Sequence, residues 1–199
     1  MRKKILLSFS IIILIATIIY FFFLRERYPL HAIIHSFTVG DSIDSYNGIV
    51  VYNNGTLYGK SHGKHYNKDS SFYYGKKWQC VEYIKRYYHD HLQHTMPNGF
   101  GHAKDFFKKD LKQGQLNKER DLRQFSNEGD VPPQANDILV FDGEYGHVAI
   151  VTEVNNEEIE IIQQNIYMTP RERYKIVKKG NNYFVGERRK PLGWLRLPH

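Results

Sequence analysis

The residue with the clearest capacity for chemistry is Cys80, the only cysteine among the 199 residues of the chain. A lone cysteine cannot form a disulfide within the chain, so it serves either as a reactive thiol or as a small buried apolar side chain. Apolar residues recur every three or four positions after it, at Val81, Ile84, Tyr88 and Leu92. This spacing predicts an amphipathic helix whose first turn contains the thiol. Free backbone N–H groups in that turn favour the thiolate, which is the nucleophilic form.

His147 is the candidate base for that thiol. It lies near the start of an apolar run over 146–154, which follows a shorter run over 137–141 and precedes a third over 158–165. Turn residues separate the three runs and predict an antiparallel meander, with the end of the third strand beside the start of the second. Because alternate residues share one face of a strand, Gln163 is expected to point inward and to orient the imidazole. By spacing alone, a structural role for this histidine stays open.

The rest of the chain contains weaker patterns. Gly48–Tyr52 is a short β-branched run that predicts a strand. A long polar loop, 53–77, then leads to Cys80. Residues 102–111 predict a second helical piece, and 112–130 read as an irregular surface segment.

The N-terminus predicts a membrane anchor. Residues 5–24 are uncharged and rich in Ile, Leu and Phe, and they are long enough to cross a bilayer as a helix. The preceding basic tip, 1–4, favours a cytoplasmic N-terminus, so a connector over 25–37 and a domain over 38–199 would follow outside. These patterns predict a single-pass protein of the cell inner membrane with its domain on the periplasmic side. A cleaved signal peptide is the alternative, although no cleavage site of small residues follows the apolar run.

Charge and histidine content exclude some classes of function. The formal net charge of +7 fits an anionic surface such as a cell wall, and an ordinary solvated face explains it equally well. The basic residues form no nucleic-acid module, so no nucleic-acid partner is expected. The histidine patch has no zinc-type spacing, and neither a metal nor another cofactor is expected; it consists of His89, His91, His94 and His102. The sequence carries no signal for an oligomeric state.

Four motifs in order resemble those of CHAP domains, the cysteine, histidine-dependent amidohydrolase/peptidase family. They are Trp78–Glu82, Asn136–Phe141, Gly146–Val151 and Gln163–Asn165. Three further segments resemble the amidase domains of bifunctional glutathionylspermidine synthetase/amidases, namely Gly48–Tyr52, Tyr73–Lys77 and Leu192–Trp194. The likeness covers residues 38–197. It implies an α+β, papain-like fold in which N-terminal helices pack on the antiparallel meander, here preceded by the transmembrane helix.

The resemblance also implies roles for individual residues. Cys80 matches the nucleophile and His147 the general base, while Gln163 occupies the position where the amidases usually have glutamate. An amide can hold an imidazole, but it cannot stabilise imidazolium as a carboxylate does. Asn165 is therefore an alternative orienting residue, and Gln79 is expected to help the backbone of the cysteine to stabilise an oxyanion.

The expected activity is hydrolysis of an amide through a thioester, and two substrate classes compete. The motifs favour a peptide-amine conjugate such as glutathionylspermidine, whereas export favours a peptidoglycan peptide. A third possibility is a weakly active or inactive binding module, because Gln163 replaces an acid. In every case residues 5–24 would supply the contact with the membrane.

Overall fold

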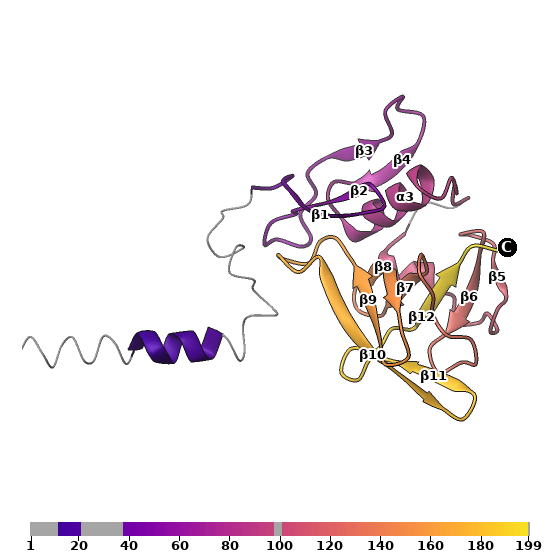
Figure 1. The fold of residues 1–199 in the computed structure, drawn as a ribbon. Coiled ribbons are helices and arrows are strands. Elements are labelled where there is room, and N and C mark those ends of the chain that lie inside the picture. The colour runs from indigo at the N-terminus through magenta and orange to yellow at the C-terminus, as the bar shows by residue number, and fades with distance from the viewer. Residues whose placement is uncertain (1–11, 21–37, 98–100, 199) are drawn as a thin grey trace, which may run out of the picture. The chain divides into compact units, whose positions relative to one another are not determined.

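The structure is a computed structural model, and it describes residues 12–20, 38–97 and 101–198. The chain divides into two units, Met1–Thr38 and Val39–His199 (Figure 1). Each unit is described by itself below.

In the first unit, residues 12–19 are helical. Among the described residues, no helix is both long and apolar enough to cross a membrane. This finding overturns the predicted transmembrane helix over 5–24 and the inner-membrane location based on it. The predicted tip, 1–4, and connector, 25–37, lie outside the described residues, as do both ends of the predicted span.

The second unit is built on an eight-stranded antiparallel sheet with the strand order β11-β10-β9-β8-β7-β12-β6-β5. The strands are β5 (Leu116–Asn117), β6 (Leu122–Ser126), β7 (Ile138–Phe141), β8 (His147–Val154), β9 (Glu158–Ile162), β10 (Arg171–Lys179), β11 (Asn182–Val185) and β12 (Gly193–Arg196). The central strands are rich in β-branched residues, and all four residues of β7 are buried, as expected for a strand covered on both faces.

Strands β7, β8 and β9 form the three-stranded meander that the alternation of apolar residues predicts. Phe141 pairs with His147 across β7 and β8, and Ile150 pairs with Ile162 across β8 and β9. The third strand ends at Ile162, before the predicted end at residue 165. The backbone N–H of Gln163 still donates a hydrogen bond to the backbone oxygen of Pro170 at 2.8 Å. The pairing between β9 and β10 therefore continues for one residue beyond the end of each strand.

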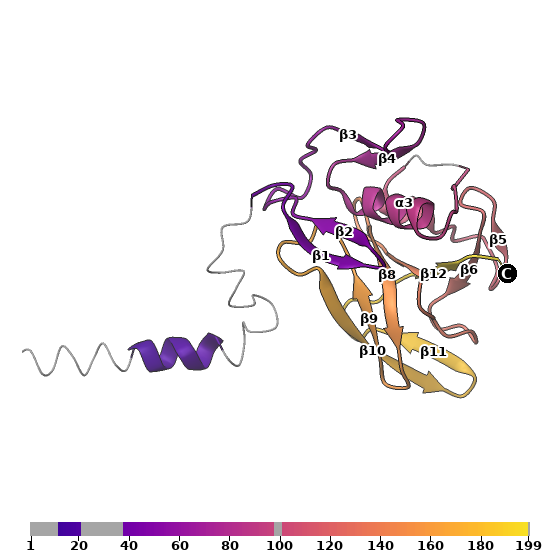
Figure 2. The same cartoon turned by 45° about the horizontal axis from the view of Figure 1, so that its top comes forward.

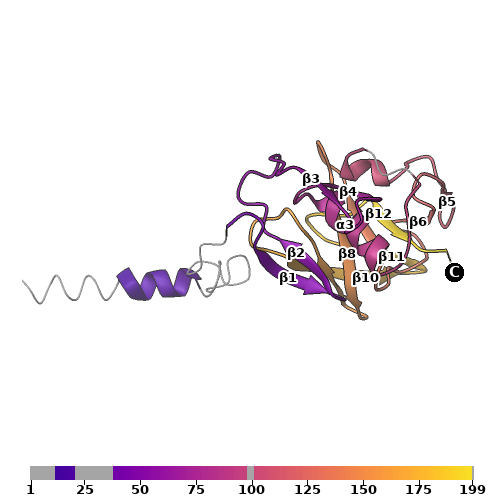
Figure 3. The ribbon, with the colours of Figure 1, turned by 90° about the horizontal axis from the view of Figure 1, so that it is seen from above.

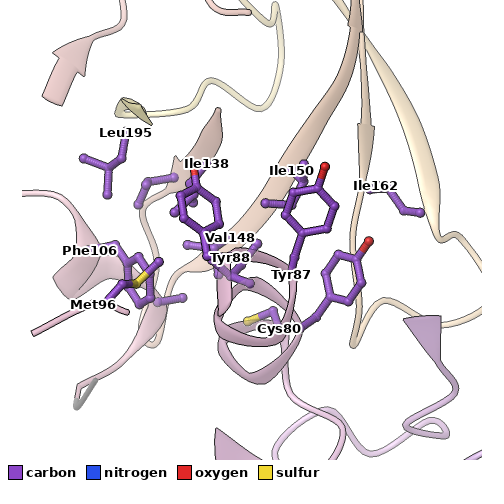
Figure 4. Packing of buried hydrophobic residues seen from close by; sticks show 14 of the residues in the cluster. Cys80, Tyr87, Tyr88, Met96, Phe106, Ile138, Val148, Ile150, Ile162 and Leu195 are labelled. Atoms are coloured by element: carbon purple, nitrogen blue, oxygen red, sulfur yellow. The ribbon is translucent and has the colours of Figure 1, made fainter. Parts of the chain in front are cut away.

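One α-helix, α3 (Cys80–Asp90), packs against β8 (Figure 2). Its apolar side chains join those of β7 and β8 in one core cluster, which includes Cys80, Ile84, Tyr88, Val148 and Ile150 (Figure 4). A second cluster lies among alternate residues of the same strands, including Leu139, Phe141, Ala149, Val151 and Trp194. The alternation along β7 and β8 thus supplies both cores, as expected from the two faces of a strand.

Two hairpins lie beside α3 (Figure 3). The first pairs β1 (Ser42–Tyr46) with β2 (Ile49–Tyr52), and the second pairs β3 (Lys64–Tyr66) with β4 (Tyr73–Lys76). The second hairpin lies within the long loop predicted over 53–77. A glycine is favoured at Gly75, because its φ is +149° and a Cβ there would lie 3.1 Å from the Cβ of Glu82. Strand β4 can therefore approach the helix closely.

The predicted fold class needs correction, because the second unit is mostly antiparallel sheet rather than a group of helices on a meander. Apart from α3, the described helical segment of this unit is a 3-10 helix of four residues, η2 (Ala103–Phe106). The apolar pair Ala103 and Phe106 fits one such turn, so the helix predicted over 102–111 does not extend further. Residues 112–130 contribute β5 and β6, and Leu122 is fully buried. The pairing of β6 with β12 is non-local, which explains why a local pattern missed it.

Candidate active site

Cys80 is the first residue of α3 and lies where this helix meets β8. Gln79 precedes it as the N-cap in an extended conformation, so the N–H groups of the first turn have no partner within the helix. The backbone amides of Val148 and Val81 donate hydrogen bonds to the Cys80 sulfur, and only 8% of the residue is exposed. Figure 4 shows the side chain at the start of the helix near Val148. One of these two amides thus belongs to Val148, the residue that follows His147 in the chain.

Burial raises the pKa of the Cys80 thiol above its ordinary value of 9.0, and the backbone hydrogen bonds and the charge of Arg189 oppose this only in part. At neutral pH the sulfur thus carries its proton. A protonated thiol is a poor nucleophile, so this site needs a neighbouring base to take the proton during attack.

His147 opens β8 and forms a buried pair with Gln163. The two side chains are joined at 3.0 Å between His147 Nε2 and Gln163 Oε1. The amide nitrogen of Gln163 donates to the backbone oxygen of Thr169 at 3.1 Å and to Oε2 of Glu172 at 3.3 Å. Both partners are acceptors, so they fix the amide with its oxygen toward the imidazole. His147 then carries its proton on Nε2, and Nδ1 has the free lone pair.

The imidazole of His147 is uncharged at neutral pH. Burial and, to a smaller extent, the charge of Arg189 together lower its pKa to about 3, although the hydrogen bond to Gln163 opposes the shift. An amide offers a dipole rather than a full negative charge, so it cannot offset the desolvation of imidazolium. The site at rest therefore combines a protonated thiol with a neutral imidazole.

Three consecutive amides after β9 hold different parts of the site. Gln163 contacts His147, as described above. Gln164 Nε2 donates to the backbone oxygen of Gln79 at 3.0 Å, and Asn165 Nδ2 donates to the side-chain oxygen of Gln79 at 2.9 Å. The run over 163–165 thus connects the end of β9 to the N-cap of α3.

Two residues predicted to act in the site have other contacts here. Asn165 does not reach His147, because its amide donates to Gln79 and to the backbone oxygen of Tyr58. The side-chain nitrogen of Gln79 donates to the backbone oxygens of Tyr58 at 3.1 Å and Lys60 at 2.8 Å. Both of its N–H groups are therefore engaged with the preceding loop, and an oxyanion role for Gln79 stays a prediction.

A second buried polar group on α3 braces the helix. We call Glu82, His65, Arg86 and Gln164 the Glu82 cluster. The Glu82 carboxylate, which is fully buried, lies 2.6 Å from Arg86 Nε, 2.8 Å from His65 Nδ1 and 2.6 Å from Gln164 Nε2. Burial alone would raise the Glu82 pKa, but the hydrogen bond from His65 and the charge of Arg86 outweigh it and hold the pKa below its ordinary value. Glu82 is thus an ionised, fully partnered carboxylate.

Sequence reasoning missed the Glu82 cluster as well as Thr169, Glu172 and Arg189. One detectable signal was the spacing of Glu82 and Arg86, which are four residues apart on one helix face. No local pattern could supply the other partners, because Gln164 is 82 residues from Glu82 along the chain.

The histidine patch at the end of α3 is dispersed. His89 stacks on Phe72 with ring centroids 4.3 Å apart, and His94 Nε2 lies 2.9 Å from the backbone oxygen of Arg120. Within the described part of the chain, no group of three or more His, Cys, Asp or Glu side chains is placed to hold a metal ion.

Two comparisons find similarity to known proteins. The model of the CHAP domain matches residues 70–165, a segment that includes Cys80, His147 and Gln163. The bifunctional glutathionylspermidine synthetase/amidase of Escherichia coli (strain K12) is 28% identical over 136 residues, which cover 62% of this chain and 22% of that protein. The protein of the same name from Shigella flexneri matches with the same identity and coverage. The chain thus spans 22% of the length of these curated relatives.

Proposed function

We propose that Cys80 is the nucleophile and His147 the general base of this chain. The chain carries a CHAP domain and so is a cysteine, histidine-dependent amidohydrolase/peptidase. Gln163 is the positioning residue for the imidazole. A CHAP enzyme acts on a peptide or amide bond, and the proposal assigns that chemistry to the start of α3 and β8.

The observation that carries the proposal is the 3.0 Å hydrogen bond between His147 and Gln163. It engages Nε2 and leaves Nδ1 able to take a proton. The Val148 amide binds the sulfur, which keeps the thiol next to the strand that begins with His147. A thiol beside an oriented, unprotonated imidazole is the arrangement that nucleophilic catalysis by cysteine requires.

In the first half of the reaction, the Cys80 sulfur attacks the amide carbonyl carbon while its proton passes to His147 Nδ1. The carbonyl oxygen becomes an oxyanion, and the backbone N–H of Cys80 is the donor we propose to stabilise it. The intermediate then collapses, the C–N bond breaks, and His147 gives its proton to the leaving amine. A thioester remains on the sulfur.

In the second half, water attacks the thioester carbonyl. His147 Nδ1 takes a proton from the water, the C–S bond breaks, and the sulfur recovers the proton as the acid leaves. Because His147 is uncharged at rest, each proton transfer accompanies a bond change instead of preceding it. This predicts slower turnover than in a site with a preformed thiolate–imidazolium pair.

The substrate class we propose is a peptide-amine conjugate. The two curated relatives are named as synthetase/amidases of glutathionylspermidine, and their similarity to this chain supports such a substrate. Peptidoglycan peptides, the alternative, were favoured by the predicted transmembrane helix, and that support is gone. A binding module without turnover is the remaining alternative, favoured by the amide at Gln163.

To test the proposal, we would incubate the full chain with glutathionylspermidine and, separately, with purified peptidoglycan, and identify the products by mass spectrometry. The matched variants are Cys80→Ala, which removes the nucleophile, and Gln163→Ala, which removes only the positioning amide. We expect release of spermidine by the wild type, complete loss in Cys80→Ala, and a loss of about 10- to 100-fold in Gln163→Ala, comparable to the loss of an orienting partner in other sites.

Equal product release by the wild type and Cys80→Ala would contradict the proposed nucleophile. Cysteine-dependent release of wall peptides alone would keep the mechanism and replace the substrate. No turnover of either substrate by a folded wild-type protein would favour the binding module.

A further inference from the structure

We propose that Arg189 forms an anion-binding subsite beside Cys80, and that the enzyme prefers amide substrates that carry a carboxylate near the scissile carbonyl. The substrate preference rests on the proposed function, whereas the subsite itself does not.

Arg189 is placed over the wall of the site by the loop between β11 and β12. Its guanidinium carbon lies 4.4 Å from the centroid of the Phe141 ring. Phe141 is the last residue of β7 and pairs directly with His147, and the two rings are 6.2 Å apart. The side chain of Arg189 is exposed, so its charge is close to the site and open to solvent at the same time.

The loop that carries Arg189 is held at both ends. Leu192 donates a backbone hydrogen bond to Val140 at 2.7 Å, which fixes the loop against β7. At the other end, Gly186 has a φ of +79°, and a Cβ there would lie 2.5 Å from the backbone oxygen of Arg189. Glycine is thus required for this tight turn. The position of the guanidinium over Phe141 follows from an anchored backbone.

The charge of Arg189 acts on both reacting groups. It opposes the effect of burial on the Cys80 thiol, which favours the thiolate. It also adds to the effect of burial on His147, which disfavours imidazolium. Both effects have the sign expected of a nearby cation, and any anion that binds between Arg189 and the sulfur would meet the same field.

Among the residues that the structure describes, no carboxylate forms an ion pair with Arg189, whereas two other basic residues of this unit have acidic partners. Arg171 pairs with Asp44 and Glu160, and the adjacent Lys190 lies 3.7 Å from Glu128. A guanidinium binds a carboxylate through two parallel hydrogen bonds. Such a group, exposed and without an acidic partner, is suited to a carboxylate supplied by a substrate.

A pair of alkylating reagents tests the subsite without any amide substrate. Iodoacetate and iodoacetamide both react when the thiolate displaces iodide, so an S–C bond forms and a C–I bond breaks. They differ in charge, since iodoacetate carries a carboxylate. Cys80 is the only cysteine, so mass spectrometry of the full chain measures each rate at a single atom.

The ratio of the two rate constants is the informative quantity. Any change in the thiolate fraction alters both rates equally and cancels in the ratio. We expect Arg189→Gln to lower the ratio of iodoacetate to iodoacetamide by about tenfold, the loss expected for one charge-assisted contact. The adjacent exposed residue provides the control, and Arg188→Gln should change the ratio less than about twofold, because Arg188 is not among the causes of the pKa shift of Cys80 or His147 and an exposed charge is screened.

An unchanged ratio in Arg189→Gln would overturn the subsite, as would an equal fall in both variants, which would indicate a general surface field. Arg189→Lys should retain part of the ratio, because it keeps the charge without the paired donors. A lowered ratio in Arg189→Gln with no amide hydrolysis by the wild type would leave the subsite standing and reject the proposed function. Amide hydrolysis by the wild type together with an unchanged ratio in Arg189→Gln would support the proposed function and reject the subsite.

Discussion

The two buried polar groups that flank the start of α3 differ in charge. In the Glu82 cluster, a carboxylate is surrounded by Arg86, His65 and Gln164 and stays ionised. By contrast, the hydrogen-bond partner that the structure describes for His147 is the neutral amide of Gln163, and the imidazole stays neutral. The chain thus uses its buried ion pair to hold the helix and an uncharged pair where the reaction is proposed.

The surroundings of Gln163 explain why an amide fits there. Its nitrogen faces the backbone oxygen of Thr169 and the carboxylate of Glu172. A glutamate would present a third acceptor to these two, and the like charge of Glu172 would disfavour its ionisation. The carboxylate of Glu172 is therefore separated from His147 by the amide of Gln163.

The largest effect on stability is expected when the buried carboxylate of the Glu82 cluster is removed. Glu82→Ala leaves Arg86 buried without its acid, so we expect unfolding in urea to show a loss of about 3–5 kcal/mol. The matched control is Glu158→Ala, whose partner Arg173 has an exposed side chain, and it should cost about 1 kcal/mol or less. Similar losses in both variants would mean that the Glu82 cluster does not brace the fold.

A smaller effect is expected when the acid is moved closer to His147. The swap Gln163→Glu with Glu172→Gln keeps the net charge and places a carboxylate against Nε2. We expect NMR titration to show a rise of about 1–3 units in the His147 pKa, and amide hydrolysis to increase. Gln163→Glu alone should raise the pKa less, because two carboxylates then repel each other. A swap that leaves the pKa unchanged would refute the role given to the Gln163 amide.

Local patterns were sufficient for the parts of the site that depend on neighbours in sequence. The apolar stripe after Cys80 placed the thiol in the first turn of a helix, and the alternation in β7, β8 and β9 placed Gln163 beside His147. Both depend on regular periods of 3.6 and 2 residues, which a sequence displays directly.

Non-local packing explains what the sequence did not predict. Strands β6 and β12 join the sheet through pairings between distant segments, so residues 112–130 looked irregular. Arg189 reaches the site only because the loop after β11 folds back over Phe141. The apolar run over 5–24 is the opposite case, since hydropathy measures composition and does not by itself establish a membrane-spanning helix.

The most direct test of the central claim is a ¹⁵N NMR titration of His147 in the wild-type protein from pH 8 to pH 5. The predicted result is a neutral ring with its proton on Nε2 throughout this range. The pKa of His147 is about 3, and Gln163 Oε1 accepts a hydrogen bond from the Nε2–H group. An imidazolium at pH 7, or a neutral ring with its proton on Nδ1, would contradict the claim that a neutral, amide-oriented histidine serves Cys80.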